Sequence, residues 1–140
     1  MSAQLPDDPQ WKRAHTLLST TNTSADLALI GVPAHLSSIS PTNADQTPDA
    51  IRSALARYST FSTSDNLDLA ANPISDLGNV QSPDGTDGIA RVHNAVKGLL
   101  NKHKLLIALG GDNSITYSVA SGLWPLANLE HTYALFKTAT

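Results

Sequence analysis

The segment Gly110-Gly111-Asp112-Asn113-Ser114 holds the residue types in this sequence that are best suited to chemistry. Two glycines directly after an apolar run allow a sharp turn and the close approach of a ligand or a neighbouring chain. The Asp112 carboxylate and the Asn113 amide oxygen are hard oxygen donors that could reach a metal cation. The same side chains could instead cap a helix that begins at Ser114, which is a purely structural role. These five residues by themselves leave both interpretations open.

Other kinds of site lack their signatures in the 140 residues. The spacing of a phosphate loop, the third glycine of a dinucleotide-binding fingerprint and the Gly-x-Ser-x-Gly of a serine hydrolase are all absent. The sequence has no cysteine, which excludes disulfides, thiolate nucleophiles and cysteine-based zinc or iron–sulfur sites. The histidines show no metal-ligand spacing such as His-x-x-x-His; they are His15, His35, His93, His103 and His131.

Three of the histidines and one acidic pair can be given roles from their positions. His35 follows the first apolar run and is the histidine that lies where a ligand could bind, although we favour a structural role for it. His93 and His103 lie on a predicted helix and at its end, so we interpret them as solvated or packed. Asp84 and Asp87 lie in a glycine-rich loop and are interpreted as turn residues rather than an acid–base pair.

The amino-acid composition argues against several functional classes of protein. Charged residues make up only 15% of the chain and the net charge is -3, which argues against a nucleic-acid-binding protein. No apolar run approaches the roughly 18 residues of a membrane span, and the first eight residues do not resemble a signal peptide. We therefore expect a cytoplasmic protein that binds neither nucleic acid nor membrane, with Trp11 and Trp124 in packing roles.

The apolar pattern predicts an α/β fold, a three-layer αβα sandwich with a parallel sheet. Residues 27–32 and 105–109 are continuous apolar runs, which is typical of central parallel strands buried on both faces. The other predicted elements are strands at 74–80 and 133–136, helices near 48–58, 88–101 and 114–123, and a loop at 19–24. Such alternation requires right-handed crossovers with helices on both faces of the sheet. Ligands then bind beyond the carboxyl ends of the strands, at residues 33–46 and 110–114.

Two of the predicted helices have identifiable local signals. Thr47 is a suitable N-cap and Pro48 suits a first turn, after which apolar residues follow at helical spacing up to Tyr58. In the second helix the residues expected on the buried face include Ile89 and Val92.

The sequence from Leu105 to Tyr117 resembles the first metal-site motif of the arginase, agmatinase and formimidoylglutamase family, the ureohydrolases. Residues 30–33, 40–43, 47–52 and 76–80 are similar to further family segments in the same order, so the resemblance covers residues 26–124. It implies an arginase-like fold of which this chain is the amino-terminal half, with residues 1–140 as a single partial domain.

The resemblance also implies a cofactor, two manganese ions per site. Most members have a histidine ligand where this chain has Asn113, so the resemblance assigns Asn113 as a metal ligand. The Asn113 variant, together with residues 40–43 and 56–60, resembles a formimidoylglutamase-like branch. The implied reaction is hydrolysis of N-formimidoyl-L-glutamate to glutamate and formamide, with a formimino or guanidino small molecule as substrate and a homo-oligomer as the assembly.

One departure from the family pattern affects the expected activity. The Asp-x-His-x-Asp segment and the later Asp-x-Asp pair that hold the metals in the family do not occur in these 140 residues. We therefore assign no catalytic residue, leave the substrate-binding residues unknown, and expect the chain by itself to bind Mn²⁺ weakly and to lack hydrolase activity. An uncovered parallel sheet further predicts that the chain is marginally stable, or is ordered only through self-association or a partner.

Two alternatives to an enzyme piece remain at this point. One is a truncated or degenerate family member that acts as a binding or assembly module, which the missing carboxylate-rich segments favour. The other is a small α/β ligand-binding domain unrelated to the family, which the shared order of segments disfavours.

Overall fold

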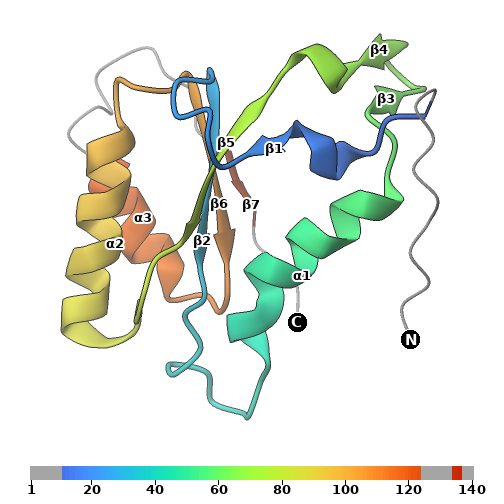
Figure 1. The fold of residues 1–140 in the computed structure, drawn as a ribbon. Helices are drawn as coiled ribbons and strands as arrows, with labels where there is room; N and C mark the ends of the chain where they lie inside the picture. Colours follow the sequence, from blue (N-terminus) through green and yellow to red (C-terminus); the bar gives the residue numbers. More distant parts are fainter. Residues whose placement is uncertain (1–10, 124–133, 137–140) are drawn as a thin grey trace.

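The computed structural model describes residues 11–123 and 134–136, and its main feature is a five-stranded parallel sheet (Figure 1). The predictions for Trp124 and Tyr133 lie outside the described residues. The strands follow the order β1-β5-β2-β6-β7 and every neighbouring pair is parallel. Their bounds are β1 Leu18–Ser19, β2 Leu27–Val32, β5 Ile74–Asn79, β6 Leu105–Gly110 and β7 Ala134–Phe136.

The two continuous apolar runs form the centre of the sheet, which confirms the prediction. β2 is the middle strand and pairs with β6 in unbroken register, from Leu27 opposite Leu105 to Val32 opposite Gly110. A central strand is covered on both faces, so each side chain along it must be apolar or small. This requirement explains why the runs show no polar alternation.

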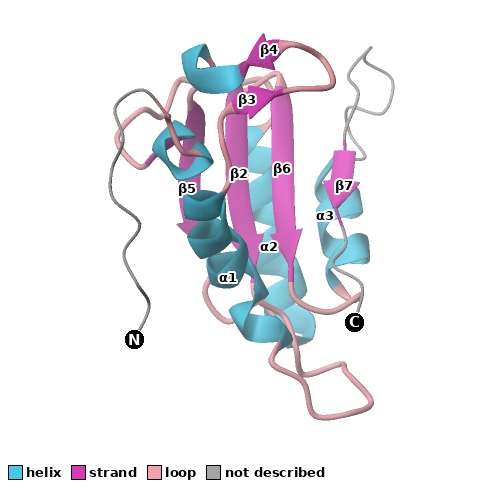
Figure 2. Ribbon diagram, turned by 90° about the vertical axis from the view of Figure 1, so that its right-hand side faces the viewer, coloured by secondary structure: helices cyan, strands magenta, loops and turns pink. Residues whose placement is uncertain are grey.

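Helices cover both faces of the sheet and complete the three layers (Figures 1 and 2). α2 (Gly85–Leu99) and α3 (Ile115–Leu123) lie side by side on one face, and α1 (Thr47–Ala54) lies on the other. The remaining described elements are a short antiparallel hairpin and several 3₁₀ turns; they are β3 Phe61–Ser62, β4 Leu67–Asp68, η1 Ala14–Leu17, η2 Ala44–Gln46, η3 Leu55–Arg57 and η4 Leu69–Ala71.

The main core lies between the sheet and the α2–α3 pair. Alternate residues of β2 and β6 face this layer and pack against two apolar residues from each helix; the members are Ala28, Ile30, Val32, Leu106, Ala108, Val92, Val96, Ile115 and Val119. Gly122 lets α3 approach α2 closely, because a Cβ there would lie 2.9 Å from the carbonyl oxygen of His93. The core therefore fixes where α3 begins and, with it, the turn that leaves β6.

Several predicted helix details differ from the structure. α1 is shorter than predicted, its N-cap is Gln46 rather than Thr47, and the chain becomes extended at Tyr58, whose side chain is 64% exposed. α2 begins at Gly85, three residues before the predicted start, and Ile89 is exposed rather than buried. Helical periodicity alone does not show which part of an amphipathic face the neighbouring layer reaches.

Near the amino terminus, the loop predicted at residues 19–24 is confirmed except at Ser19, and the prediction for Trp11 was wrong. Ser19 belongs to β1 and pairs with Ser75, because the edge of β5 offers backbone hydrogen-bonding groups that a two-residue strand can pair with. Such a short edge strand needs no run of apolar residues, so the sequence pattern did not indicate it. Trp11 is 58% exposed and does not have the packing role that was predicted. None of the described helices is long and apolar enough to cross a bilayer.

Candidate active-site edge

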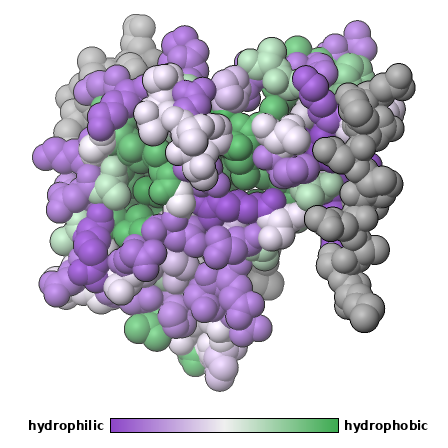
Figure 3. Space-filling model, in the orientation of Figure 1, coloured by the Kyte–Doolittle hydropathy of each residue, from purple (hydrophilic) through white to green (hydrophobic). Residues whose placement is uncertain are grey.

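The carboxyl ends of β2, β5 and β6 lie at one edge of the sheet, which is the lower edge in Figure 2. Hydrophilic residues dominate the lower part of the face shown in Figure 3, whereas hydrophobic residues gather nearer its middle. The segments that leave these strands, residues 33–46, 80–84 and 111–114, are therefore brought together although they are far apart in the sequence. This edge is where the sequence predicted that a ligand would bind.

The chain that leaves β6 lies directly against the chain that leaves β2. The N–H of Gly111 donates to the carbonyl oxygen of Val32 at 2.9 Å, and the N–H of Asp112 donates to that of Ala34 at 2.8 Å. A Cβ on Gly111 would lie 2.0 Å from the Ala34 oxygen, so this approach requires glycine. Gly111 thus serves the contact between the two strand exits, whereas a Cβ on Gly110 would instead meet the side chain of Ile115 in α3.

Asp112 uses its carboxylate to join these segments. One oxygen accepts hydrogen bonds from the Ser114 N–H at 3.0 Å and the Ser114 hydroxyl at 2.6 Å. The other accepts from the hydroxyls of Ser37 at 2.7 Å and Ser38 at 3.3 Å. Burial raises the pKa of Asp112, but these hydrogen bonds outweigh burial and lower the pKa overall. Asp112 thus organises the turn before α3, but its partner is Ser114, which precedes the helix, rather than an N–H of α3 as the capping interpretation expects.

Asn113 is exposed and lies at an open cavity of about 550 Å³. The cavity lies between the loop after β2 and the turn after β6; its lining residues are Ser37, Ser38, Ile39, Ser40, Pro41, Thr42, Ala44, Gly111, Asp112 and Asn113. The structure therefore brings the predicted metal ligand together with the serine-rich loop that the sequence analysis singled out.

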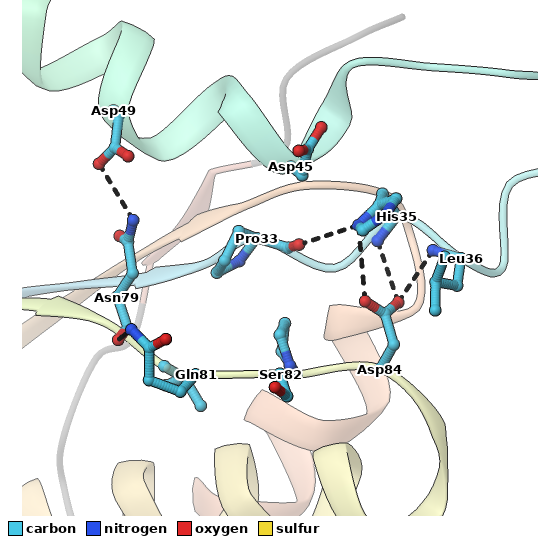
Figure 4. Close-up of a pocket in the computed structure, with 11 residues that line it drawn as sticks. Pro33, His35, Leu36, Asp45, Asp49, Asn79, Gln81, Ser82 and Asp84 are labelled. Carbon is cyan, nitrogen blue, oxygen red and sulfur yellow. Dashed lines mark hydrogen bonds and ion pairs between the residues drawn. The ribbon is translucent and has the colours of Figure 1, made fainter.

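A second cavity, of about 530 Å³, lies on the other side of the same loop (Figure 4). The Asp84 carboxylate accepts hydrogen bonds from the N–H groups of His35 at 3.0 Å and Leu36 at 2.9 Å. It also lies 3.6 Å from the ring Nδ1 of His35, which is 3.4 Å from the Pro33 carbonyl oxygen. Asp84 is thus more than the turn residue that was predicted, because it holds the loop that carries His35.

Arg52 makes the densest set of polar contacts at this edge, and the sequence analysis missed it. Its guanidinium donates two parallel hydrogen bonds to Asp76, both at 2.8 Å. It also donates to the Asn79 side chain at 2.7 Å, to the Gly78 carbonyl at 3.1 Å and to Asp49 at 3.2 Å. These contacts fix α1 to the end of β5. An arginine in α1 and an acid near the end of a strand were the signals that could have indicated the pair.

The model of the arginase family matches residues 25–128 of the chain. The chain belongs to the arginase family. The resemblance to this family is therefore confirmed, and the disfavoured alternative of an unrelated α/β ligand-binding domain is excluded.

Individual arginase-family relatives agree with this assignment. Over 93 residues the chain is 38% identical to a formimidoylglutamase from Halalkalibacterium halodurans, a match that covers 64% of this chain and 29% of the relative. The crystal structure of formimidoylglutamase from Bacillus subtilis has a TM-score of 0.77 at 28% identity, covering 89% of this chain and 41% of that one. Trypanosoma cruzi formiminoglutamase with Mn²⁺ has the same fold, with a TM-score of 0.74 at 20% identity and coverages of 84% and 41%. This chain spans about a third of the length of the curated relatives it matches.

The described residues do not by themselves fit the two-manganese centre that the arginase family implies. Within residues 11–123 and 134–136 no three side chains of the types His, Cys, Asp and Glu lie close enough to hold one metal ion. The four hydrogen bonds of Asp112 use the lone pairs of its carboxylate, which leaves Asn113 as the exposed donor of the motif. We therefore assign no catalytic step to a metal held by these residues.

Two other histidines have structural partners. The ring Nδ1 of His93 lies 3.1 Å from the Ser121 hydroxyl, and that of His103 lies 2.7 Å from the Ala25 carbonyl oxygen. These contacts agree with the packed roles predicted for both residues.

The Arg52–Asp76 pair gives this arginase-family chain an expected pH dependence of stability. Burial raises the pKa of Asp76, but the hydrogen bonds from Arg52 and from the Gly78 N–H, together with the Arg52 charge, lower it overall. A lowered folded-state pKa adds stability above the unfolded value of about 3.9, and that stability is lost as the pH falls through the folded-state pKa. We expect Asp76→Asn to unfold more easily than the parent at pH 7 and this difference to shrink below about pH 4. Urea unfolding at a series of pH values measures this, and parallel profiles would contradict it.

Proposed function

We propose that this chain forms part of a cytoplasmic, homo-oligomeric hydrolase that converts N-formimidoyl-L-glutamate and water to glutamate and formamide. The observation that carries the proposal is the position of the Gly-Gly-Asp-Asn turn. It lies at the carboxyl end of β6 and opens into a cavity walled by the loop after β2. The 38% identity to a formimidoylglutamase over 93 residues supports this substrate over arginine or agmatine.

In this proposal Asn113 supplies one oxygen donor to a manganese centre. The side-chain carbonyl oxygen of asparagine is a ligand type that suits Mn²⁺. Asn113 is exposed at the cavity, so its side chain is accessible to a metal ion. The bound metals would supply an activated water at neutral pH. The remaining donors must come from residues other than those described. The residues of this chain position Asn113 and form one wall of the cavity.

The first test uses the 140-residue chain itself. We expect calorimetry to show no stoichiometric binding at micromolar Mn²⁺, because a single amide oxygen cannot offset the charge of two divalent cations. We also expect no formamide release from N-formimidoyl-L-glutamate. Asn113→Ala and the exposed helical control Asn94→Ala should behave like the parent. Tight binding that Asn113→Ala abolishes would show that the site is already complete in this chain.

The second test uses the protein encoded by the complete reading frame that contains this sequence. With Mn²⁺ added, we expect release of formamide and glutamate, and less or no turnover of agmatine and arginine. In that protein Asn113→Ala should lower manganese affinity, whereas Asn94→Ala should not. A folded, manganese-loaded protein without turnover of N-formimidoyl-L-glutamate would refute the proposal.

A second candidate function is a non-catalytic binding or assembly module of the same family. In this alternative the complete reading frame also lacks the Asp-x-His-x-Asp and Asp-x-Asp carboxylates, which do not occur in the 140 residues. The complete reading frame distinguishes the two candidates, since an enzyme requires those carboxylates and a module does not. Sedimentation analysis would then establish the oligomeric state of either.

A further inference from the structure

The loop that leaves the central strand β2 is held from both sides by carboxylates. Asp84 comes from the β5 side and accepts the N–H groups of His35 and Leu36. Asp112 comes from the β6 side and accepts the hydroxyls of Ser37 and Ser38. β5 and β6 are the two neighbours of β2, so these acids lie on opposite sides of one strand exit.

The carboxylates of Asp84 and Asp112, which we call the two clamps, bind different groups of the loop. Asp84 binds backbone N–H groups of the loop. It therefore fixes the path of the backbone independently of which side chains the loop carries. Asp112 binds two serine hydroxyls, while its own N–H donates to the Ala34 carbonyl at 2.8 Å. Neighbouring Gly111 brings the two backbones into direct contact. Four consecutive residues, 35–38, thus have a partner in one of the two acids.

Beyond the clamped residues the loop projects away from the protein. Ile39 is fully exposed, and residues 39–42 with Ala44 form the outer wall of the cavity at Asn113. The position of that wall relative to Asn113 is therefore set by the clamped residues before it. An unclamped loop of this length would sample many conformations, since it has few buried apolar contacts of its own.

We infer that Asp84 and Asp112 are positioning residues, which hold the loop after β2 at a defined distance from Asn113 and so set the size of small molecule that the cavity admits. Asp112 acts through Ser37 and Ser38, and its role here is to shape the cavity rather than to bind a metal. The size-selection part of this inference rests on the proposed function; the positioning part does not.

The absence of cysteine from the sequence permits a direct distance measurement. Spin labels on Ile39→Cys and Tyr117→Cys, both at exposed positions, report the separation of the loop from α3 in the 140-residue chain. We expect one narrow distance distribution in this background. The pair Ser37→Ala and Ser38→Ala removes both partners of one Asp112 oxygen and should broaden the distribution. The single-label protein Ile39→Cys identifies any distances that arise between chains.

Ser40→Ala is the matched control for the serine substitutions. Ser40 lies in the same loop and makes no side-chain hydrogen bond within the described part of the chain, so the distribution should stay narrow. Ser37→Thr with Ser38→Ala restores one hydroxyl and should narrow it again. An unchanged distribution in the double alanine variant would overturn the inference for Asp112.

Hydrogen exchange tests the Asp84 clamp separately. Asp84→Ala should speed exchange of the His35 and Leu36 amides by about tenfold, and Asp84→Asn, which keeps an acceptor oxygen, should restore part of the protection. Equal exchange in the parent and Asp84→Ala would overturn the inference for Asp84.

In the complete protein, the double serine variant should raise the KM for N-formimidoyl-L-glutamate by a larger factor than it lowers kcat. Lack of turnover in the parent would refute the proposed function and leave the distance and exchange results standing.

Discussion

Replacing Arg52 by methionine is expected to lower the free energy of unfolding by about 3 kcal/mol. The Arg52 side chain is only 15% exposed and that of Asp76 only 9%, so removal of the guanidinium leaves a largely buried carboxylate without its counter-ion. Methionine keeps most of the apolar stem, which separates the loss of charge from a loss of packing. Urea unfolding of the purified variant measures the change.

Two further variants show whether the geometry of Arg52 matters. Arg52→Lys keeps the charge but cannot make two parallel hydrogen bonds to Asp76 while reaching Asn79, so it should recover less than half of the loss. Arg57→Met is the matched control, because Arg57 is exposed and should change the stability by less than about 0.5 kcal/mol. Equal stabilities of Arg52→Met and Arg57→Met would mean that the network contributes nothing.

Gly111→Ala is expected to have an effect at least as large, above about 3 kcal/mol, or to displace the loop after β2. The new Cβ would lie 2.0 Å from the Ala34 carbonyl oxygen and 2.9 Å from its nitrogen. Both are backbone atoms, which cannot move aside as a side chain does. Relief of the overlap would also lengthen the hydrogen bond from the Asp112 N–H to Ala34.

Gly98→Ala is the same substitution at a position where we expect the opposite effect on stability. Gly98 lies in α2 with nothing within 4 Å of an added Cβ. The substitution should therefore raise the stability by about 0.5–1 kcal/mol, through the higher helix propensity of alanine. Thermal unfolding of the two variants beside the parent makes the comparison. A tolerated Gly111→Ala with an unmoved loop would show that the two strand exits do not lie as close as the structure places them.

Both predictions concern the edge of the sheet on which the proposed function depends. Arg52 fixes α1 to the end of β5, and Gly111 lets the exits of β2 and β6 meet. The loop after β2 lies between these two contacts. If the edge is organised as described, Gly111→Ala should also broaden the spin-label distance between Ile39→Cys and Tyr117→Cys, whereas Gly98→Ala should leave it narrow.

The sequence by itself determined the centre of the fold and the family. Residues 27–32 and 105–109 are apolar throughout, a pattern typical of strands covered on both faces, so both could be predicted as central strands of a parallel sheet. The structure then showed that they pair directly as β2 and β6. The carboxyl edge followed from this topology, and the Gly-Gly-Asp-Asn turn could be placed on it. The resemblance to the arginase family, confirmed over residues 25–128, depended on the same segments.

Only the tertiary structure decided which polar groups meet at that edge. Asp112 contacts Ser37 across 75 residues, Asp84 contacts the His35 N–H across 49, and Arg52 contacts Asp76 across 24. Apolar periodicity is a local signal, because it records which face of one element is covered. A hydrogen bond between two strand exits depends instead on strand order, on register and on the path of each loop to within a fraction of an ångström. Many serines and aspartates in this sequence have similar neighbours along the chain. The strand order and register of the sheet determine which few of them become hydrogen-bond partners.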